Sequence, residues 1–175
     1  SPNPALVVDR RGDVVDANPA AFRLLEELVA ADSPALEPAL NAHRIVLHPE
    51  GMRARTENWE EVAANILQRL EREHAHRPAD EALAALVTEM LAYPGLGELR
   101  RQTELPTGAD LLVTLRATTI GGQDIRLLST IATIGAPYDV TLDELRLETF
   151  FPGDEETAAV LAGWHDERHD GVEND

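Results

Sequence analysis

The stretch ALVVDRRGDVVDANPAAFRLL, residues 5–25, decides the expected fold of this chain. Two short apolar runs flank a turn at residues 9–13, where Gly12 can adopt the positive φ of a tight hairpin and the aspartates can bond the turn backbone. Asn18 is a favourable helix N-cap, and Pro19 suits the first helical position because its missing N–H is not needed there. The stretch therefore predicts a strand, a turn, a second strand and a capped helix.

The composition fits one domain with its own hydrophobic core. The chain has 175 residues, of which 43% are hydrophobic and only 4% aromatic, so aliphatic side chains must fill the core. The absence of cysteine excludes disulfides, thiolate metal sites and cysteine nucleophiles, and suits a reducing compartment. No apolar run approaches the ~20 residues of a membrane span, and no signal peptide is visible. We therefore expect a cytoplasmic protein with no membrane contact.

The charge argues against direct contact with nucleic acid. The net charge is -17, and all 15 basic residues are arginine. Such a negative field repels phosphates, so this segment is not expected to bind DNA or RNA. The absence of lysine beside abundant alanine looks like the codon bias of a high-GC bacterium. A start at Ser1 without methionine suggests a piece excised from a longer protein.

The middle of the chain predicts helices. Apolar residues recur at i, i+3, i+4, i+7, i+8 and i+11 over residues 59–70, which is one face of an amphipathic helix. Asn58 and Glu61 have the spacing of a capping box for that helix, and Asp80 is a cap for the next one. We expect a short strand at residues 44–47 before these helices.

The second half of the chain changes to strand periodicity. Alternation over residues 111–120, a glycine turn at 121–124 and an apolar return over 125–134 predict a long hairpin. Asp154 is positioned to cap a last helix. The fold class expected from these elements is α+β, with an antiparallel sheet and helices packed on one face. No repeat or linker interrupts the chain.

The predicted domain covers residues 1–164, and residues 165–175 form a polar C-terminal tail. His165 and His169 in that tail are spaced i, i+4, but Asp166 stands where a metalloprotease motif has glutamate, and no third ligand accompanies them. No nucleophile motif or phosphate-binding glycine loop is present either. The sequence therefore predicts no catalytic residue, no metal and no cofactor.

The order of elements resembles that of a known ligand-binding domain. The matching stretches, in chain order, are NPAA at 18–21, NAHR at 41–44, HP at 48–49, NWEEVA at 58–63, LLSTIATIGAPYDVT at 127–141 and ETFFP at 148–152. They resemble the MmyB-like ligand-binding domain of XRE-type transcription regulators, in its actinobacterial branch. The chain departs from the family at Ala42-His43, where members usually have apolar residues.

The resemblance implies a PAS-like domain that follows an N-terminal helix-turn-helix in the whole regulator. DNA binding would then belong to that missing domain. It also implies a pocket for an apolar small molecule, with fatty acids as the leading class. The runner-up is a fully packed interaction module, a possible homodimer without a ligand, and an enzyme ranks third.

The candidate ligand-binding residues come from the apolar stripes and the polar positions beside them. They are Phe22, Leu25, Arg44, Trp59, Leu86, Met90, Leu115, Ser129 and Thr130. The packing role is the favoured alternative for Trp59, Met90 and Phe22, with Trp59 anchoring its helix on the sheet. Arg44 could face a ligand carboxylate or pair with one of the 32 acidic residues. Ser129 and Thr130 could orient a polar head group or bond their own strand edges.

Overall fold

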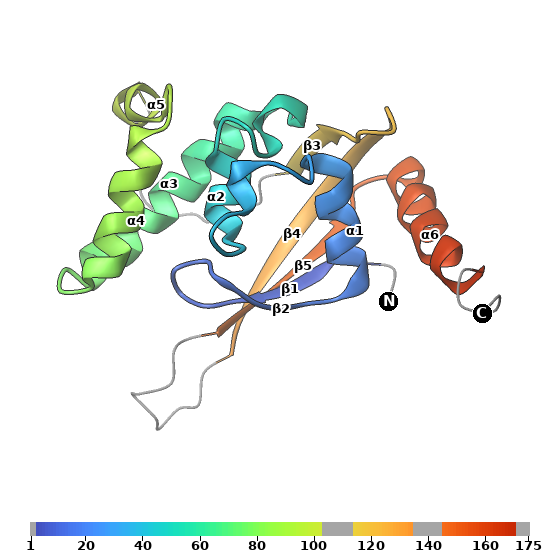
Figure 1. Ribbon diagram of the computed structural model, residues 1–175, viewed down its shortest axis with the longest axis horizontal. Helices are drawn as coiled ribbons and strands as arrows, with labels where there is room; N and C mark the ends of the chain where they lie inside the picture. The colour runs from blue at the N-terminus through green and yellow to red at the C-terminus, as the bar shows by residue number, and fades with distance from the viewer. Residues whose placement is uncertain (1–2, 103–113, 135–144, 171–175) are drawn as a thin grey trace.

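The sheet has five antiparallel strands in the order β2-β1-β5-β4-β3, so the two ends of the chain supply its centre (Figure 1). The computed structural model describes residues 3–102, 114–134 and 145–170. The strands are β1 (Ala5–Val8), β2 (Val14–Ala17), β3 (Thr114–Thr118), β4 (Asp124–Ile134) and β5 (Leu145–Pro152).

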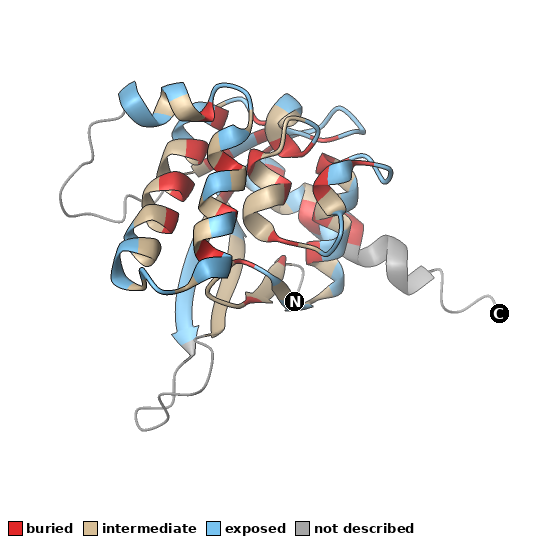
Figure 2. Ribbon diagram, turned by 60° about the vertical axis from the view of Figure 1, so that its left-hand side comes forward, coloured by how far each residue is buried: buried red, intermediate tan, exposed pale blue. Residues whose placement is uncertain are grey.

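Helices cover one face of this sheet, with buried residues on their inward sides (Figure 2). They are α1 (Pro19–Leu28), α2 (Ala42–Leu47), α3 (Trp59–His76), α4 (Glu81–Ala92), α5 (Leu96–Gln102) and α6 (Glu155–Asp170), with short 3-10 turns η1 (Pro34–Leu36) and η2 (Met52–Arg55). This arrangement confirms the predicted α+β class. Helix α6 continues to Asp170, six residues into the segment predicted as a tail.

The opening hairpin and its helix form as the sequence predicts. Gly12 has φ +83°, and the Asp9 carboxylate accepts hydrogen bonds from the turn amides of Arg11 and Asp13 at 2.8 and 2.9 Å. The Asn18 side chain caps α1 by accepting from the Ala21 amide at 2.9 Å. These local bonds fix where the chain turns before any long-range packing is considered.

One local prediction was wrong, and another was confirmed only in part. The run at residues 44–47 is not a strand but part of α2, because the side-chain Oδ1 of Asn41 accepts from the amides of His43 and Arg44 and caps a helix there. Asn58 occupies the N-cap position of α3, as predicted, but its side chain makes no capping hydrogen bond. Its amide nitrogen instead donates to Glu61 and to the Thr114 carbonyl oxygen, so it ties the start of α3 to β3.

Strand β5 was not predicted at all, although it pairs with both β1 and β4. The predicted strand start at residues 111–113 lies outside the described residues. The remaining helix predictions are confirmed, since Asp80 caps α4 and Asp154 accepts a hydrogen bond from the Thr157 amide at the start of α6.

The buried apolar residues form two clusters. The first joins α1, α2, η2 and α6 to the sheet and includes Leu24, Leu28, Ile45, Leu115, Leu127 and Leu161. The second lies among α2, α3, α4 and α5 and includes Leu47, Trp59, Leu67, Leu70, Leu83 and Met90. Helix α2 contributes to both clusters and therefore stands between the sheet and the helical layer.

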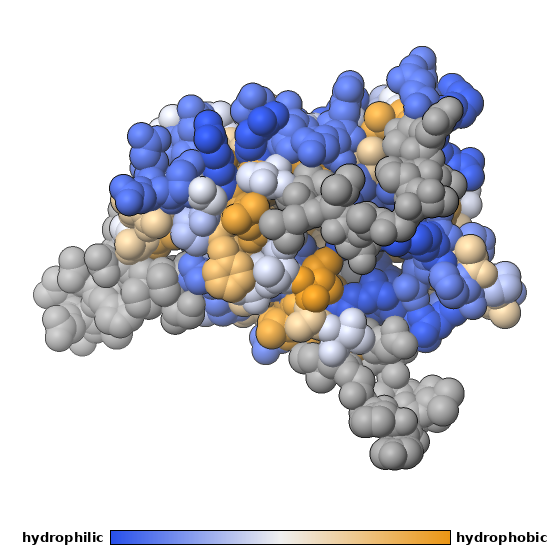
Figure 3. All heavy atoms as spheres, turned by 180° about the vertical axis from the view of Figure 1, so that it is seen from behind, coloured by the Kyte–Doolittle hydropathy of each residue, from blue (hydrophilic) through white to orange (hydrophobic). Residues whose placement is uncertain are grey.

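The outer face of the sheet keeps apolar side chains at its surface. Leu128 on β4 is paired with Phe151 on β5, and Ala132 with Leu147, so these four residues share the face that points away from α1, α2 and α3. Phe151 is 40% exposed. Seen from behind, hydrophobic side chains are exposed in the middle of a largely hydrophilic surface (Figure 3).

Candidate ligand-binding site

A cavity of about 770 Å³ lies between the inner face of the sheet and helices α1, α2 and α3. Ligand sites for small molecules typically have volumes of roughly 300–1,000 Å³, so this one has an ordinary size for that purpose. Much of its wall is aliphatic and comes from every surrounding element, as with Leu6, Leu28, Ile45, Ile66, Leu115 and Leu127. The interior therefore offers an apolar surface next to the sheet.

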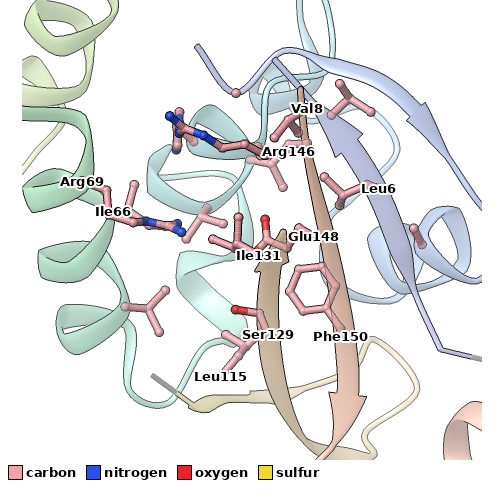
Figure 4. A pocket seen from close by; sticks show the side chains of 18 of the residues that line it. Leu6, Val8, Ile66, Arg69, Leu115, Ser129, Ile131, Arg146, Glu148 and Phe150 are labelled. Carbon is pink, nitrogen blue, oxygen red and sulfur yellow. The ribbon is translucent and has the colours of Figure 1, made fainter. Parts of the chain in front are cut away.

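Polar side chains gather in one part of this wall, between α3 and the central strands. Arg69 extends from α3 toward the sheet, and Glu148 on β5 and Ser129 on β4 point into the same space (Figure 4). Arg146 on β5 and His43 on α2 complete the group. The cavity thus has an apolar part against α1 and a charged part against α3.

Glu148 occupies an environment that disfavours its charge. Burial raises the pKa of the Glu148 carboxyl, while the positive charge of Arg69 and a hydrogen bond from the Ser129 hydroxyl lower it by a smaller amount. The carboxyl consequently keeps its proton to a higher pH than an exposed glutamate does. It can donate a hydrogen bond into the cavity when protonated and accept one when ionised.

His43 is held neutral. Burial, followed by the positive charges of Arg69 and Arg146, lowers the pKa of His43 to about 3. The ring packs against the backbone of Gly12, where an added Cβ would lie 2.4 Å from the imidazole Cδ2 atom. The hairpin turn therefore needs glycine for two reasons, its positive φ and the space that the ring occupies.

The two arginines of the group differ in their partners. Arg146 forms an ion pair with Glu73 of α3 at 2.7 Å, and Glu73 also pairs with Arg77. Arg69 takes part in none of the ion pairs among the described residues, and its Nε atom is buried without a hydrogen-bond partner. Arg69 is the cation of this wall whose charge the described residues leave uncompensated at close range.

Five of the nine sequence-predicted residues line the cavity: Phe22, Leu25, Leu115, Ser129 and Thr130. Phe22 is 44% exposed, which places it at the rim rather than in the interior. Leu115 is buried in the first cluster, and Leu25 packs against that cluster from α1.

Arg44 lies away from the cavity, in the ion pair that was its alternative interpretation. Its guanidinium donates to both carboxylate oxygens of Glu89 on α4, at 2.8 and 3.0 Å. The Tyr93 hydroxyl donates to the same carboxylate at 2.6 Å. These bonds hold the pKa of Glu89 below its ordinary value, the hydrogen bond from Arg44 being the largest cause. Arg44 thus joins α2 to α4.

Trp59, Leu86 and Met90 also lie outside the cavity wall, in the cluster among the helices. Trp59 packs there rather than on the sheet. Its indole Nε1 donates to the Val46 carbonyl oxygen at 3.0 Å, and the Arg53 guanidinium lies 3.9 Å from the centre of its ring. Trp59 therefore anchors α3 to α2.

The charged part of the cavity was not predicted from the sequence, although two signals for it were present. Asn65, Arg69, Glu73 and His76 line the cavity at helical spacing, beside the apolar stripe of α3. Arg146, Glu148 and Phe150 alternate with outward residues along β5 and also line it. A polar stripe on a helix usually faces solvent, and β5 was not recognised as a strand, so neither signal was used.

Among the described residues, no three histidine, aspartate or glutamate side chains are grouped as a metal site would require. No helix in the described part of the chain is long and apolar enough to cross a bilayer.

Comparison with protein families gives one match that spans most of the chain. Residues 1–163 match the model of the MmyB-like transcription regulator ligand binding domain. A search of curated proteins finds no significant match. The family match covers both the cavity wall and the helical cluster.

Proposed function

Because the chain belongs to the MmyB-like transcription regulator ligand binding domain family, we propose that it senses a small molecule with a fatty-acid-like chain for a bacterial transcription regulator. The observation that carries this proposal is the cavity of about 770 Å³ between the sheet and α1, α2 and α3. Its apolar wall suits an alkyl chain, and its charged wall suits a polar end.

The size of the apolar wall supports a long chain rather than a small solute. Each buried methylene contributes about 0.8 kcal/mol, so a chain of about a dozen carbons gains enough to outweigh the entropy lost on ordering. With few aromatic rings at the wall, stacking on a planar ligand contributes little. A flexible aliphatic ligand fits an aliphatic wall better.

The regulator's DNA contacts are assigned to an XRE-type helix-turn-helix outside this domain. The net charge of -17 supports this division, because a strongly acidic domain repels the phosphate backbone. Ligand binding would shift the population of domain arrangements in the cytoplasm toward the one that holds the ligand better. The isolated domain should show no sequence-specific DNA affinity in a gel-shift assay, and tight binding would contradict this division.

A dimerisation module without a ligand is the second candidate. The exposed apolar side chains on the outer face of the sheet, including Phe151, favour a homodimer. That candidate was proposed with a fully packed interior, however, and a cavity of this volume favours the sensor. Dimerisation and ligand binding do not exclude each other, since a dimer can also bind a ligand in each cavity.

The test is extraction of the purified protein for mass spectrometry, followed by delipidation and titration with saturated fatty acids of increasing length. Ligand at about 100 times its Kd stabilises a one-site protein by about 2.7 kcal/mol, which raises the Tm of a domain this size by roughly 5–10 °C. Stabilisation should rise with chain length and fall once the chain outgrows the cavity. If no lipid is extracted and no acid moves the Tm, the ligand-free module is the better assignment.

A pair of variants on α1 ties the binding to the cavity. Leu25 lines the cavity, whereas Glu26 beside it is exposed. Leu25→Trp should occupy part of the cavity and abolish the Tm shift by long acids. Glu26→Trp introduces the same side chain on the same helix and should leave the shift intact. Equal shifts in both variants would place the ligand elsewhere.

A further inference from the structure

The charged wall of the cavity is unevenly compensated. Arg146 is paired with Glu73, and Arg10, which also lines the cavity, is paired with Asp80 at 3.7 Å. His43 is neutral, since burial lowers its pKa to about 3. Arg69 remains as a cation beside Glu148, which lies beyond ion-pair distance and resists ionisation.

Arg69 is also placed to meet a ligand. It follows Ile66 by one turn of α3, and both side chains line the cavity, with the guanidinium directed toward β4 and β5 (Figure 4). A buried, unpaired nitrogen such as its Nε is costly unless something supplies an acceptor. The space it faces is shared with the Glu148 carboxyl and the Ser129 hydroxyl.

We propose that Arg69 is the receptor for a single carboxylate at the polar end of the ligand, with Glu148 and Ser129 beside it and the alkyl chain directed toward α1. This inference rests on the proposed function and specifies which end of the ligand lies where. The planar guanidinium matches a carboxylate by two parallel hydrogen bonds. A protonated Glu148 can donate a third bond to the same group.

The same surroundings select against other head groups. A dianionic phosphate would meet the Glu148 carboxyl, and in the described part of the wall Arg69 alone is left to balance its second charge. A neutral alcohol would leave the Arg69 guanidinium without a counter-charge, which is unfavourable in a low-dielectric site. The cavity should therefore prefer a fatty acid to an alcohol or a phosphate ester of the same length.

The experiment compares dodecanoate with dodecanol, which share an alkyl chain and differ at the head group. Charge-assisted hydrogen bonds contribute about 1.5–3 kcal/mol, which corresponds to roughly 10–100-fold in Kd. Titration calorimetry on the wild-type domain should show tighter binding of dodecanoate by that factor. Equal affinity for the two ligands would overturn the inference but leave the proposed function intact, whereas no binding of either would refute the proposed function.

Substitution of Arg69 gives the second arm. Arg69→Met should weaken dodecanoate by about 10-fold or more and leave dodecanol within about two-fold. Arg69→Lys keeps the positive charge but loses the planar, bidentate guanidinium, so its affinity for dodecanoate should lie between those of wild type and Arg69→Met. Arg116→Met is the matched control, because Arg116 lies on β3 with its side chain exposed beside Glu57. Unchanged dodecanoate binding in Arg69→Met, or equal loss of both ligands, would remove Arg69 from the head-group site. If Arg69→Met does not fold, Arg69→Lys takes its place, and dodecanoate binding equal to that of wild type would remove Arg69 from the head-group site.

Discussion

Acidification should destabilise this domain through His43. The folded pKa of His43 is about 3, against an ordinary value of 6.5 in the unfolded chain. Below pH 6.5 the unfolded chain binds a proton that the folded domain does not, so stability present above pH 6.5 is lost as the pH falls toward 3. From pH 7 to pH 5 the two pKa values give a loss of about 2 kcal/mol, or roughly 4–8 °C in Tm.

Urea unfolding at pH 7 and pH 5, with wild type and His43→Gln side by side, measures this contribution. The variant removes the titrating ring, so its loss on acidification should be smaller than that of wild type by about 2 kcal/mol. Taking the difference between the two proteins cancels the opposite contribution of Glu148, whose raised pKa favours the folded state at lower pH.

The reasoning is refuted if His43→Gln loses as much stability as wild type between pH 7 and pH 5. That outcome would mean that the ring is protonated in the folded domain, and hence that Arg69 and Arg146 do not face it as described.

Two further predictions concern the elements around the cavity. Trp59→Ala should lower the free energy of unfolding by about 3–5 kcal/mol, because it empties a buried position and leaves the Val46 carbonyl oxygen unpaired. A urea midpoint equal to that of wild type would show that the indole is not the anchor of α3. Asn41→Ala should lower the free energy of unfolding by about 2–4 kcal/mol, because it removes the α2 cap and the hydrogen bond from the Asn41 amide to Asp13 at 2.9 Å. A far-UV circular dichroism melt measures the effect, and an unchanged Tm would contradict it.

The opening hairpin, the cap of α1 and helix α3 are predicted well from the sequence because their signals are local. The turn at Gly12, the Asn18 cap and the apolar stripe of α3 all depend on neighbours within a few residues. Strand β5 carries a misleading signal, because its alternation places the charged residues Arg146 and Glu148 on the inner face and leucines on the outer one. Only the cavity behind β5 explains charged side chains on the inner face of a sheet.

Prediction of the cavity wall is limited in the same way, because it too depends on tertiary packing. Leu115 was predicted from strand alternation and Ser129 as a hydroxyl that could orient a head group, and both line the cavity. Arg44 was the predicted cation, but it was expected on a strand, and in α2 its side chain reaches Glu89 instead. Whether an arginine faces a carboxylate or a cavity depends on which helix lies opposite, and that is a property of tertiary packing.

The division of the interior into two clusters has a consequence for how this domain can diverge. Substitutions in separate clusters share few neighbours, so their effects on stability should be close to additive. Relatives can therefore exchange residues around the cavity, and with them the preferred chain length, without weakening the helical layer. Helices α2 and α3 are exceptions: Ile45 belongs to the first cluster and Leu47 to the second, and Ile66 of the second cluster also lines the cavity. Changes in these two helices are the ones that should require compensating substitutions on both sides.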